Sequence, residues 1–405
     1  MEISDFKPLK NALDKTLKEN ILKFWINNTI DKENGGFISF IDSKNSPDTK
    51  ANKGIILTSR ILWTFSAVYG YEKNDTHLKL ANRAYQYLVN YFKDNKHGGV
   101  YWELNCAGQP VNKRKQVYAQ AFTIYSLAEY FKITKNEEVK EWAKDLFNLL
   151  ETYSFDENRH GYIEAFAEDW GETEDVKLSD KEGNEKKTMN THLHVLEAYT
   201  NLYRVWPDDR LYHALFKLIH VFIKYFINNN YRQILFFTED WVPRDTIISY
   251  GHDMECSWLL YEAAEVIKNE ELIEKTGDLA VKMAENVIKT GIDQSGGINY
   301  ETDISKNHTD DDKHWWVQAE GLVGLMNAWQ LSKNPVFKKK LFNLWKFIDS
   351  YIIDHENGEW FWKVDNRGIP DDKYEKVGPW KCPYHNARAC MEVIRRINDV
   401  GISSG

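Results

Sequence analysis

A glycine-punctuated stretch recurs along the chain at nearly constant intervals, and this repeat constrains the fold more than any other feature. The copies read NGGFISF at 34–40, HGGVYWEL at 97–104, HGYIEAF at 160–166, ILFFTEDW at 234–241, GGINYETD at 296–303 and NGEWFWKV at 357–364. With positions 36, 99, 161, 235, 297 and 358 as markers, the steps are 63, 62, 74, 62 and 61 residues. The long step contains a charged insertion at 171–187, and the fourth copy, which lacks the glycine, is the weakest. Such spacing predicts one structural unit repeated six times.

Each marker lies between two predicted helices. Long amphipathic segments precede the markers, around 9–28, 76–93, 137–153, 209–228, 270–290 and 334–353. Segments richer in Ala, Gly and Ser follow them, around 54–70, 113–131, 187–206, 248–268, 311–331 and 379–397. Apolar residues three and four positions apart, as at Leu193, Leu196 and Tyr199, indicate helices. Small residues suit an inner ring, where backbones crowd together.

We therefore expect an all-α fold, an (α/α)6 barrel of six helical hairpins with short β-like connecting segments. Residues 1–405 would form a single catalytic domain. An open solenoid of six hairpins is the alternative, but the ends of the chain show no polar capping repeats.

Composition limits the classes of function that the chain can have. A net charge of −9 without a basic stripe argues against nucleic acid as a partner. No apolar run approaches the roughly 20 residues that a membrane span needs. The N-terminus has no apolar signal segment and the four cysteines form no C-x-x-C pair, so we expect a cytoplasmic protein. We also expect it to act as a monomer. The 15 Trp, 22 Tyr and 20 Phe suit a binding cleft for sugars.

Polar and aromatic residues gather near the starts of the six predicted inner helices. In chain order they are Arg60, Tyr118, Asn190, His194, His252, Glu255, Trp258, Trp316, Glu320, Trp380 and His385. Each of them alone would more often be structural than functional. All lie about 17 to 33 residues after their markers, however, so a closed barrel brings them to one mouth. Spacings of three or four residues within a helix place several of them on one face.

The pair His192 and His194 in MNTHLHVLEAY raises the question of a metal site. On a strand the two side chains would point the same way, whereas on a helix they diverge, so we expect only His194 to face the mouth. Three histidines and two glutamates remain adequate ligands for Zn, Mn or Fe, although no HExxH motif occurs. Glu255 and Glu320 could alternatively form the acid/base pair of a glycoside hydrolase. A non-catalytic sugar-binding protein is a third possibility.

Histidines suit proton transfer near neutral pH, and an inner-helix N-terminus disfavours imidazolium. Two such bases on opposite sides of a sugar carbon could remove a proton from one face and return one to the other. Arg60 would stabilise the enediolate between these steps. We find no G-x-G-x-x-G after a strand and no phosphate loop, so we expect neither a cofactor nor a metal.

Four motifs resemble the cellobiose 2-epimerase family of the N-acylglucosamine 2-epimerase superfamily. They are MNTHLHVLEAYTNLYRVW, SYGHDMECSWLL, HWWVQAEGLVG and GPWKCPYHNAR, and the resemblance extends over essentially the whole chain. It implies an (α/α)6 barrel that epimerises C2 of the reducing-end glucose or mannose of β-1,4-linked disaccharides such as cellobiose, lactose and mannobiose, without a cofactor. Mannobiose 2-epimerase as the physiological role, N-acylglucosamine 2-epimerase and mannose isomerase are the alternatives within the superfamily.

The resemblance also implies roles for the residues at the mouth. His252 and His385 correspond to the acid/base pair at C2, His194 to the residue that assists ring opening, and Arg60 to the residue that contacts O1 and O2. The remaining seven would bind the substrate: Tyr118, Asn190, Glu255, Trp258, Trp316, Glu320 and Trp380. Trp316 and Trp380 would provide stacking faces for the sugar rings. The insertion at 171–187 is either a mobile flap over the mouth or a plain surface loop.

Overall fold

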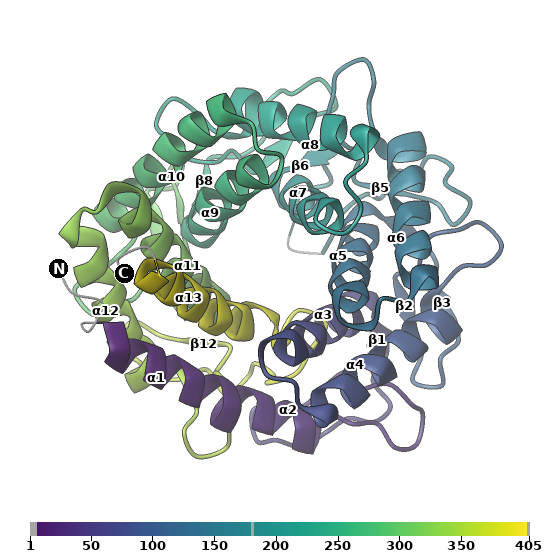
Figure 1. Cartoon of the computed structure of the whole chain (residues 1–405), viewed down its shortest axis with the longest axis horizontal. Coiled ribbons are helices and arrows are strands. Elements are labelled where there is room, and N and C mark those ends of the chain that lie inside the picture. Colours follow the sequence, from purple (N-terminus) through teal and green to yellow (C-terminus); the bar gives the residue numbers. More distant parts are fainter. Residues whose placement is uncertain (1–5, 180–181, 403–405) are drawn as a thin grey trace.

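Helices form two concentric rings (Figure 1). The computed structural model describes residues 6–179 and 182–402. The inner ring contains α3 (Ile55–Tyr71), α5 (Val117–Thr134), α7 (Met189–Tyr203), α9 (Tyr250–Val266), α11 (Trp315–Ser332) and α13 (Tyr384–Ile402). The outer ring contains α1 (Lys7–Lys15), α2 (Lys23–Asn28), α4 (Asp75–Tyr87), α6 (Glu137–Leu149), α8 (Asp209–Val221), α10 (Glu270–Thr290) and α12 (Pro335–Phe347). The predicted (α/α)6 barrel is confirmed.

The two rings differ in how their helices are buried. On α5 every residue from Val117 to Ala128 is buried, as expected for a helix that neighbours cover on all sides. On α6 only one stripe is buried, at Val139, Trp142, Ala143, Leu146 and Phe147, and the rest faces outward. Within the described ranges, no helix combines the length and the apolar character that crossing a membrane would require.

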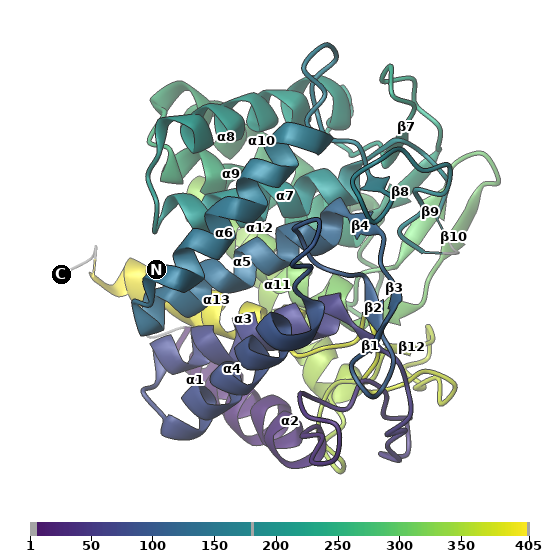
Figure 2. The ribbon, with the colours of Figure 1, turned by 90° about the vertical axis from the view of Figure 1, so that its right-hand side faces the viewer.

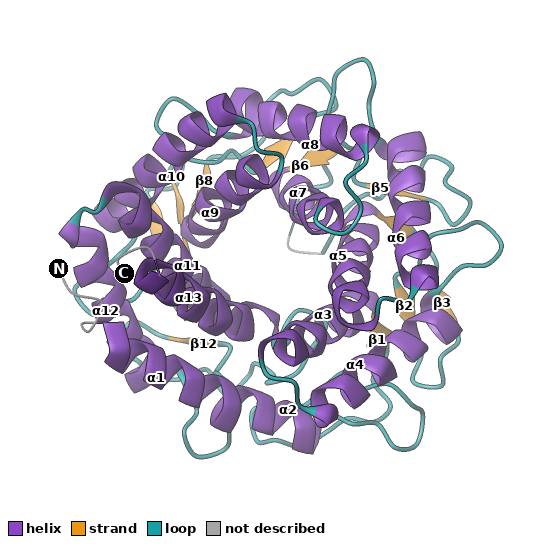
Figure 3. Cartoon of the chain, in the orientation of Figure 1, coloured by secondary structure: helices purple, strands orange, loops and turns teal. Residues whose placement is uncertain are grey.

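Short antiparallel strands join neighbouring repeats at one end of the barrel (Figures 2 and 3). They are β1 (Lys53–Gly54), β2 (Glu103–Leu104), β3 (Pro110–Asn112), β4 (Lys115–Gln116), β5 (Ala165–Phe166), β6 (Lys187–Thr188), β7 (Phe236–Phe237), β8 (Ile247–Ser249), β9 (Glu301–Asp303), β10 (His308–Asp310), β11 (Lys313–His314) and β12 (Lys363–Val364). The ladders are β1-β2-β3, β4-β5, β6-β7, β8-β9-β10 and β11-β12. Each ladder pairs the strand before one inner helix with a strand of the next repeat, so the inner-helix N-termini gather at this end.

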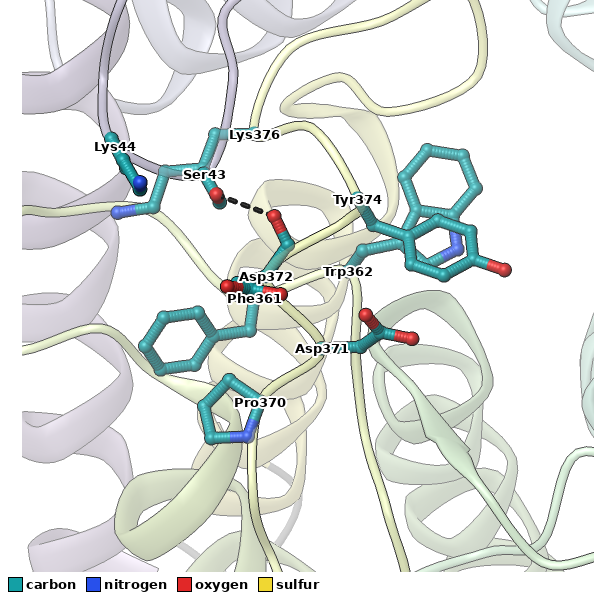
Figure 4. Close-up of a pocket in the computed structure, with 9 residues that line it drawn as sticks. All are labelled: Ser43, Lys44, Phe361, Trp362, Pro370, Asp371, Asp372, Tyr374 and Lys376. Atoms are coloured by element: carbon teal, nitrogen blue, oxygen red, sulfur yellow. Dashed lines mark hydrogen bonds between the residues drawn. The ribbon is translucent and has the colours of Figure 1, made fainter.

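The last repeat closes onto the first. Helix α13 packs against both α11 and α3, and Ile41 pairs with Val377 in an antiparallel bridge. At this seam the Ser43 hydroxyl donates to the carbonyl of Asp372 at 2.7 Å, beside a cavity of about 140 Å³ (Figure 4). Because the ring is closed, the solenoid alternative is wrong.

The glycine of the repeat allows an inner helix to hold the turn beside it. Gly161 has φ +78°, and a Cβ there would lie 2.7 Å from Nε2 of His192. That nitrogen accepts the backbone N–H of Tyr162 at 2.8 Å, while Nδ1 bonds the Thr188 carbonyl at 2.6 Å. His192 is therefore a structural bridge in the wall, and its predicted divergence from His194 on a helix agrees with α7.

Glutamines form the same bridge in two other repeats. Gln120 accepts the N–H of Val100 at 2.9 Å and donates to the Val100 carbonyl at 3.1 Å. Gln318 makes the same two bonds to Ile298, both at 2.8 Å. His192 takes the position of these glutamines, which explains a histidine there without invoking a metal.

Candidate active site

The eleven predicted site residues lie at the strand-bearing end of the barrel. Arg60 is on α3, Tyr118 on α5, Asn190 and His194 on α7, His252, Glu255 and Trp258 on α9, Trp316 and Glu320 on α11, and His385 on α13. Trp380 lies in the segment before α13, because α13 begins at Tyr384, whereas the predicted helix began at about residue 379. None of the eleven lines the seam cavity of Figure 4.

His194 is held by a carboxylate one turn further along α7. Its Nδ1 lies 2.9 Å from Oε2 of Glu197, and both side chains are buried. Because a carboxylate can only accept, Nδ1 carries the proton and Nε2 keeps a free lone pair. The rings of Tyr118 and Phe122 pack on the imidazole, with centroids 4.9 and 4.6 Å away. The imidazole therefore has a fixed tautomer and orientation.

Arg60 is held by groups from two other elements. One guanidinium nitrogen donates to the hydroxyl of Tyr118 at 2.8 Å, and the other to the carbonyl of Trp380 at 3.5 Å. The guanidinium carbon lies 4.2 Å from the centroid of Phe122. No carboxylate among the described residues pairs with Arg60, so its charge is available to an oxyanion.

His385 and His252 both flank Trp316. The ring centroid of Trp316 lies 4.7 Å from that of His252 and 5.9 Å from that of His385. Nδ1 of His385 donates to Oε1 of Glu320 at 2.7 Å, and Nδ1 of His252 lies 2.8 Å from the hydroxyl of Ser249. In both histidines a neighbouring side chain engages Nδ1.

Arg388 connects these parts, and the sequence analysis did not single it out. Its Nη2 donates to Oε1 of Glu255 and to Oε1 of Glu320, each at 2.7 Å. Its Nη1 bonds the carboxylate of Glu197, which the hydroxyl of Tyr384 also reaches. Glu255 and Glu320 are thus buried and paired rather than solvated.

A signal for these missed residues was present in the spacing. Glu197 lies three residues after His194, and Arg388 lies three residues after His385, so each shares a helix face with a predicted histidine. Trp258 is also buried and donates its indole N–H to Glu320 at 3.1 Å. Its observed contact is therefore with a carboxylate that bonds Arg388 rather than with an open surface.

Burial favours the neutral form of the three histidines at the candidate site. Burial lowers the pKa of His252 and of His385 to about 3, and it also lowers the pKa of His194. Positive charge that would develop on neighbouring histidines lowers the pKa of His252 further. Burial, rather than the helix dipole expected from the sequence, is the largest cause of these lowered pKa values.

The insertion at 171–187 packs against the mouth, although residues 180 and 181 lie outside the described residues. Val176 and Leu178 are buried, and the Val176 carbonyl accepts a hydrogen bond from Gln116 at 3.2 Å. Burial raises the pKa of Glu182 to about 7, and a hydrogen bond from Asn190 opposes that rise. The described part of the insertion is therefore more than a plain surface loop, and it adds a carboxyl group beside Asn190.

A metal would have to compete with Arg388. Ligand atoms of Glu255, Glu320 and His385 lie within 4.8 Å of one another, which suits a metal by distance. The guanidinium already bonds both carboxylates, so it supplies the cation that such a cluster needs.

The chain is similar to known proteins over most of its length. The N-acylglucosamine 2-epimerase (GlcNAc 2-epimerase) family profile matches residues 35–389. A cellobiose 2-epimerase of Bacteroides fragilis is 42% identical over 387 residues, covering 95% of this chain and 98% of that protein. A cellobiose 2-epimerase of Dictyoglomus turgidum is 38% identical, and the match covers 97% of this chain and 100% of that protein. The structure of a cellobiose 2-epimerase from Bacillus thermoamylovorans superposes with a TM-score of 0.92 at 40% identity, covering 96% and 99%.

The chain belongs to the N-acylglucosamine 2-epimerase family, and it is a carbohydrate epimerase, an isomerase. Within this family the three relatives just described are cellobiose 2-epimerases, as the resemblance of its four motifs implied.

Proposed function

We propose that this protein epimerises C2 of the reducing-end glucose or mannose in β-1,4-linked disaccharides, with cellobiose, lactose and mannobiose as substrates. The observation that carries the proposal is the pair of buried histidines, His252 and His385, whose rings both lie against Trp316. Each has Nδ1 engaged and Nε2 available for a proton at C2. Similarity to cellobiose 2-epimerases supports the choice of substrate.

The reaction begins with the sugar ring opening, for which His194 transfers the proton between the ring oxygen and the anomeric hydroxyl. In the glucose-to-mannose direction one of His252 and His385 removes the C2 proton, which gives a cis-enediolate. The charge of Arg60 stabilises O1 and O2 of that intermediate. The other histidine takes a proton from solvent at Nε2 and delivers it to the opposite face of C2, while the first histidine releases its proton to solvent. Every step is a proton transfer, so no redox cofactor takes part.

Stacking on aromatic rings accounts for binding of the two sugar rings. Trp316 would face the reacting sugar, because both acid/base histidines contact it. Trp380 would stack on the second sugar, since it lies on the other side of the mouth. Its ring centroid is 5.9 Å from that of Tyr118 and 6.2 Å from that of Trp102. Trp102 was not foreseen from the sequence.

Incubation with cellobiose in D2O tests the proposal. The expected product is glucosylmannose with deuterium at C2, identified by NMR. Product without deuterium would contradict exchange through the two histidines. Released glucose would instead indicate a glycoside hydrolase, and affinity for cellobiose without any product would indicate a sugar-binding protein. Loss of activity in EDTA with recovery on adding a divalent metal would restore the metal alternative.

Two histidines on α7 provide a matched control. His194→Ala, His252→Ala and His385→Ala should each lower kcat by about 10² to 10⁴, the usual contribution of a positioned acid or base. His192→Gln should keep activity, because glutamine forms the same bridge in two other repeats. Wild-type activity in His252→Ala or His385→Ala would defeat the assignment. Rates with cellobiose, lactose, mannobiose, N-acetylglucosamine and mannose then identify the preferred substrate.

A further inference from the structure

Three buried carboxylates share one guanidinium beneath the mouth. Glu197, Glu255 and Glu320 have exposed fractions of 3%, 1% and 0%, and Arg388 has 1%. Arg388 bonds all three. Three negative charges against one positive charge are costly to bury, because Coulomb repulsion is strong where water is excluded. A proton on one of the carboxylates relieves this imbalance.

Hydrogen-bond donors are distributed unequally over the three carboxylates. Glu320 accepts from the indole of Trp258, from Nδ1 of His385 and from Arg388. Glu197 also has three donors, which are His194, Tyr384 and Arg388. Among the described residues Glu255 accepts from Arg388 alone. Donors stabilise the ionised form, so the proton belongs on Glu255.

Glu255 and Glu320 lie close to each other around Arg388. Both bond the same nitrogen, Nη2 of Arg388, and their ligand atoms lie within 4.8 Å. Two carboxylates this close in a buried site do not both ionise. Five other charged or titratable groups interact electrostatically with Glu255. They are Arg60 on α3, Tyr118 on α5, Glu197 on α7, Cys256 on α9 and Tyr384 at the start of α13.

The directions of the two pKa shifts agree with a proton on Glu255. Burial, and then the charge of Glu320, raise the pKa of Glu255. Burial alone would raise the pKa of Glu320 too, but Arg388 and the N–H of His385 outweigh it and lower that pKa.

We propose that Glu255 is a neutral carboxylic acid in the resting enzyme, and that its O–H donates to a sugar oxygen next to C2. This role rests on the proposed epimerase reaction. Glu255 lies three residues after His252, on the same face of α9, so it reaches the sugar that His252 serves. The proton stays on Glu255, while negative charge develops on the enediolate oxygen that accepts the hydrogen bond. Glu320 remains ionised and holds the Nδ1–H of His385, which keeps His385 a base at Nε2.

Infrared difference spectroscopy of the free enzyme tests the protonation state without substrate. At pH 7 the wild type should show the carbonyl band of an un-ionised carboxyl group that disappears in Glu255→Gln. Burial also raises the pKa of Glu164 to about 8, so Glu164→Gln is the matched control and should remove a different band. A spectrum that Glu255→Gln leaves unchanged would overturn the proposal, even if the protein epimerises disaccharides.

Kinetics test the donor role. Glu255→Gln should keep kcat within about tenfold of the wild type, because an amide N–H also donates, whereas Glu255→Leu should lower kcat about a hundredfold or more, the usual cost of one donor at a developing oxyanion. The wild type should lose kcat/KM at alkaline pH as Glu255 ionises, and Glu255→Gln should lose this limb of the profile. Equal losses in Glu255→Gln and Glu255→Leu, or an unchanged alkaline limb in Glu255→Gln, would overturn the donor role.

Discussion

At the scale of single residues, two histidines separated by one leucine have different environments. His194 donates to Glu197 and lies among the rings of Tyr118 and Phe122. His192 bonds backbone groups of Tyr162 and Thr188 instead. The helical geometry of α7 separates them by almost half a turn, which accounts for one facing the site and the other the wall.

His192 makes stability depend on pH in a known direction. Burial lowers its pKa from 6.5 to about 3, so below pH 6.5 the unfolded chain binds a proton that the folded chain refuses. Stability is therefore lost as the pH falls from about 6.5 towards 3. His192→Gln should remove up to about 1.4 kcal/mol of this loss per pH unit. Chemical denaturation at pH 4 to 7 measures the free energy of unfolding of both proteins. His213→Gln, on the exposed side of α8, is the control. If the free energy of unfolding of His192→Gln falls with pH as steeply as that of the wild type, His192 is not the cause of the pH dependence.

At the scale of elements, buried lysines attach the inner helices to the turns after the outer helices. The pairs are Lys53–Asp31 at 2.6 Å, Lys115–Asp94 at 2.6 Å, Lys187–Asp156 at 2.9 Å, Lys313–Asp293 at 2.8 Å and Lys376–Asp354 at 2.5 Å. The fourth repeat differs, because Asn228 and Ile248 stand where the others have aspartate and lysine. This repeat is also the one whose sequence marker lacks the glycine, so two departures from the pattern fall in the same unit.

The fourth repeat provides a design for testing such a pair. Lys115→Ile should destabilise the fold by about 3 to 5 kcal/mol, because it leaves Asp94 buried without its cation. Adding Asp94→Asn should recover most of the loss, since Asn228 accepts the backbone N–H groups of its own turn as Asp94 does. Denaturant unfolding gives the free energy of unfolding of the single and double variants. A double variant as unstable as the single one would show that the unpaired charge of Asp94 is not the cause of the loss.

At the scale of the whole molecule, closure of the ring makes the first and last repeats equivalent to the others. α13 contacts α3 as well as α11, and the bridge from Ile41 to Val377 joins the chain ends of the barrel. In an open array the terminal units have one neighbour and open first. Here each inner helix has two neighbours in the ring.

Hydrogen exchange measures this consequence directly. Backbone amides of α3 and α13 should be protected to within about tenfold of those of α7 and α9, because opening any of them breaks the same closed ring. Mass spectrometry of peptic fragments gives the rates. Exchange in α13 much faster than in α7, under conditions where the enzyme is active, would show that the seam opens independently.

Periodicity along the chain predicts the architecture and the end of the barrel where the candidate site residues lie. The repeat spacing gave the number of units, and the apolar and small-residue patterns separated outer from inner helices. The common phase of residues such as Arg60, His252 and His385 then placed them at one mouth. Local periodicity suffices for these conclusions, because helix faces and repeat phase are properties of neighbouring residues along the chain.

How the candidate site residues are held depends on contacts between helices that are far apart in the sequence. Arg388 reaches Glu197, Glu255 and Glu320, which lie 191, 133 and 68 residues away. Closure of the ring brings these inner helices together, and no periodicity within one helix specifies a partner on another. Protonation depends on the donors and the burial that such contacts create, so the neutral histidines and the carboxylate pair follow from the closed barrel.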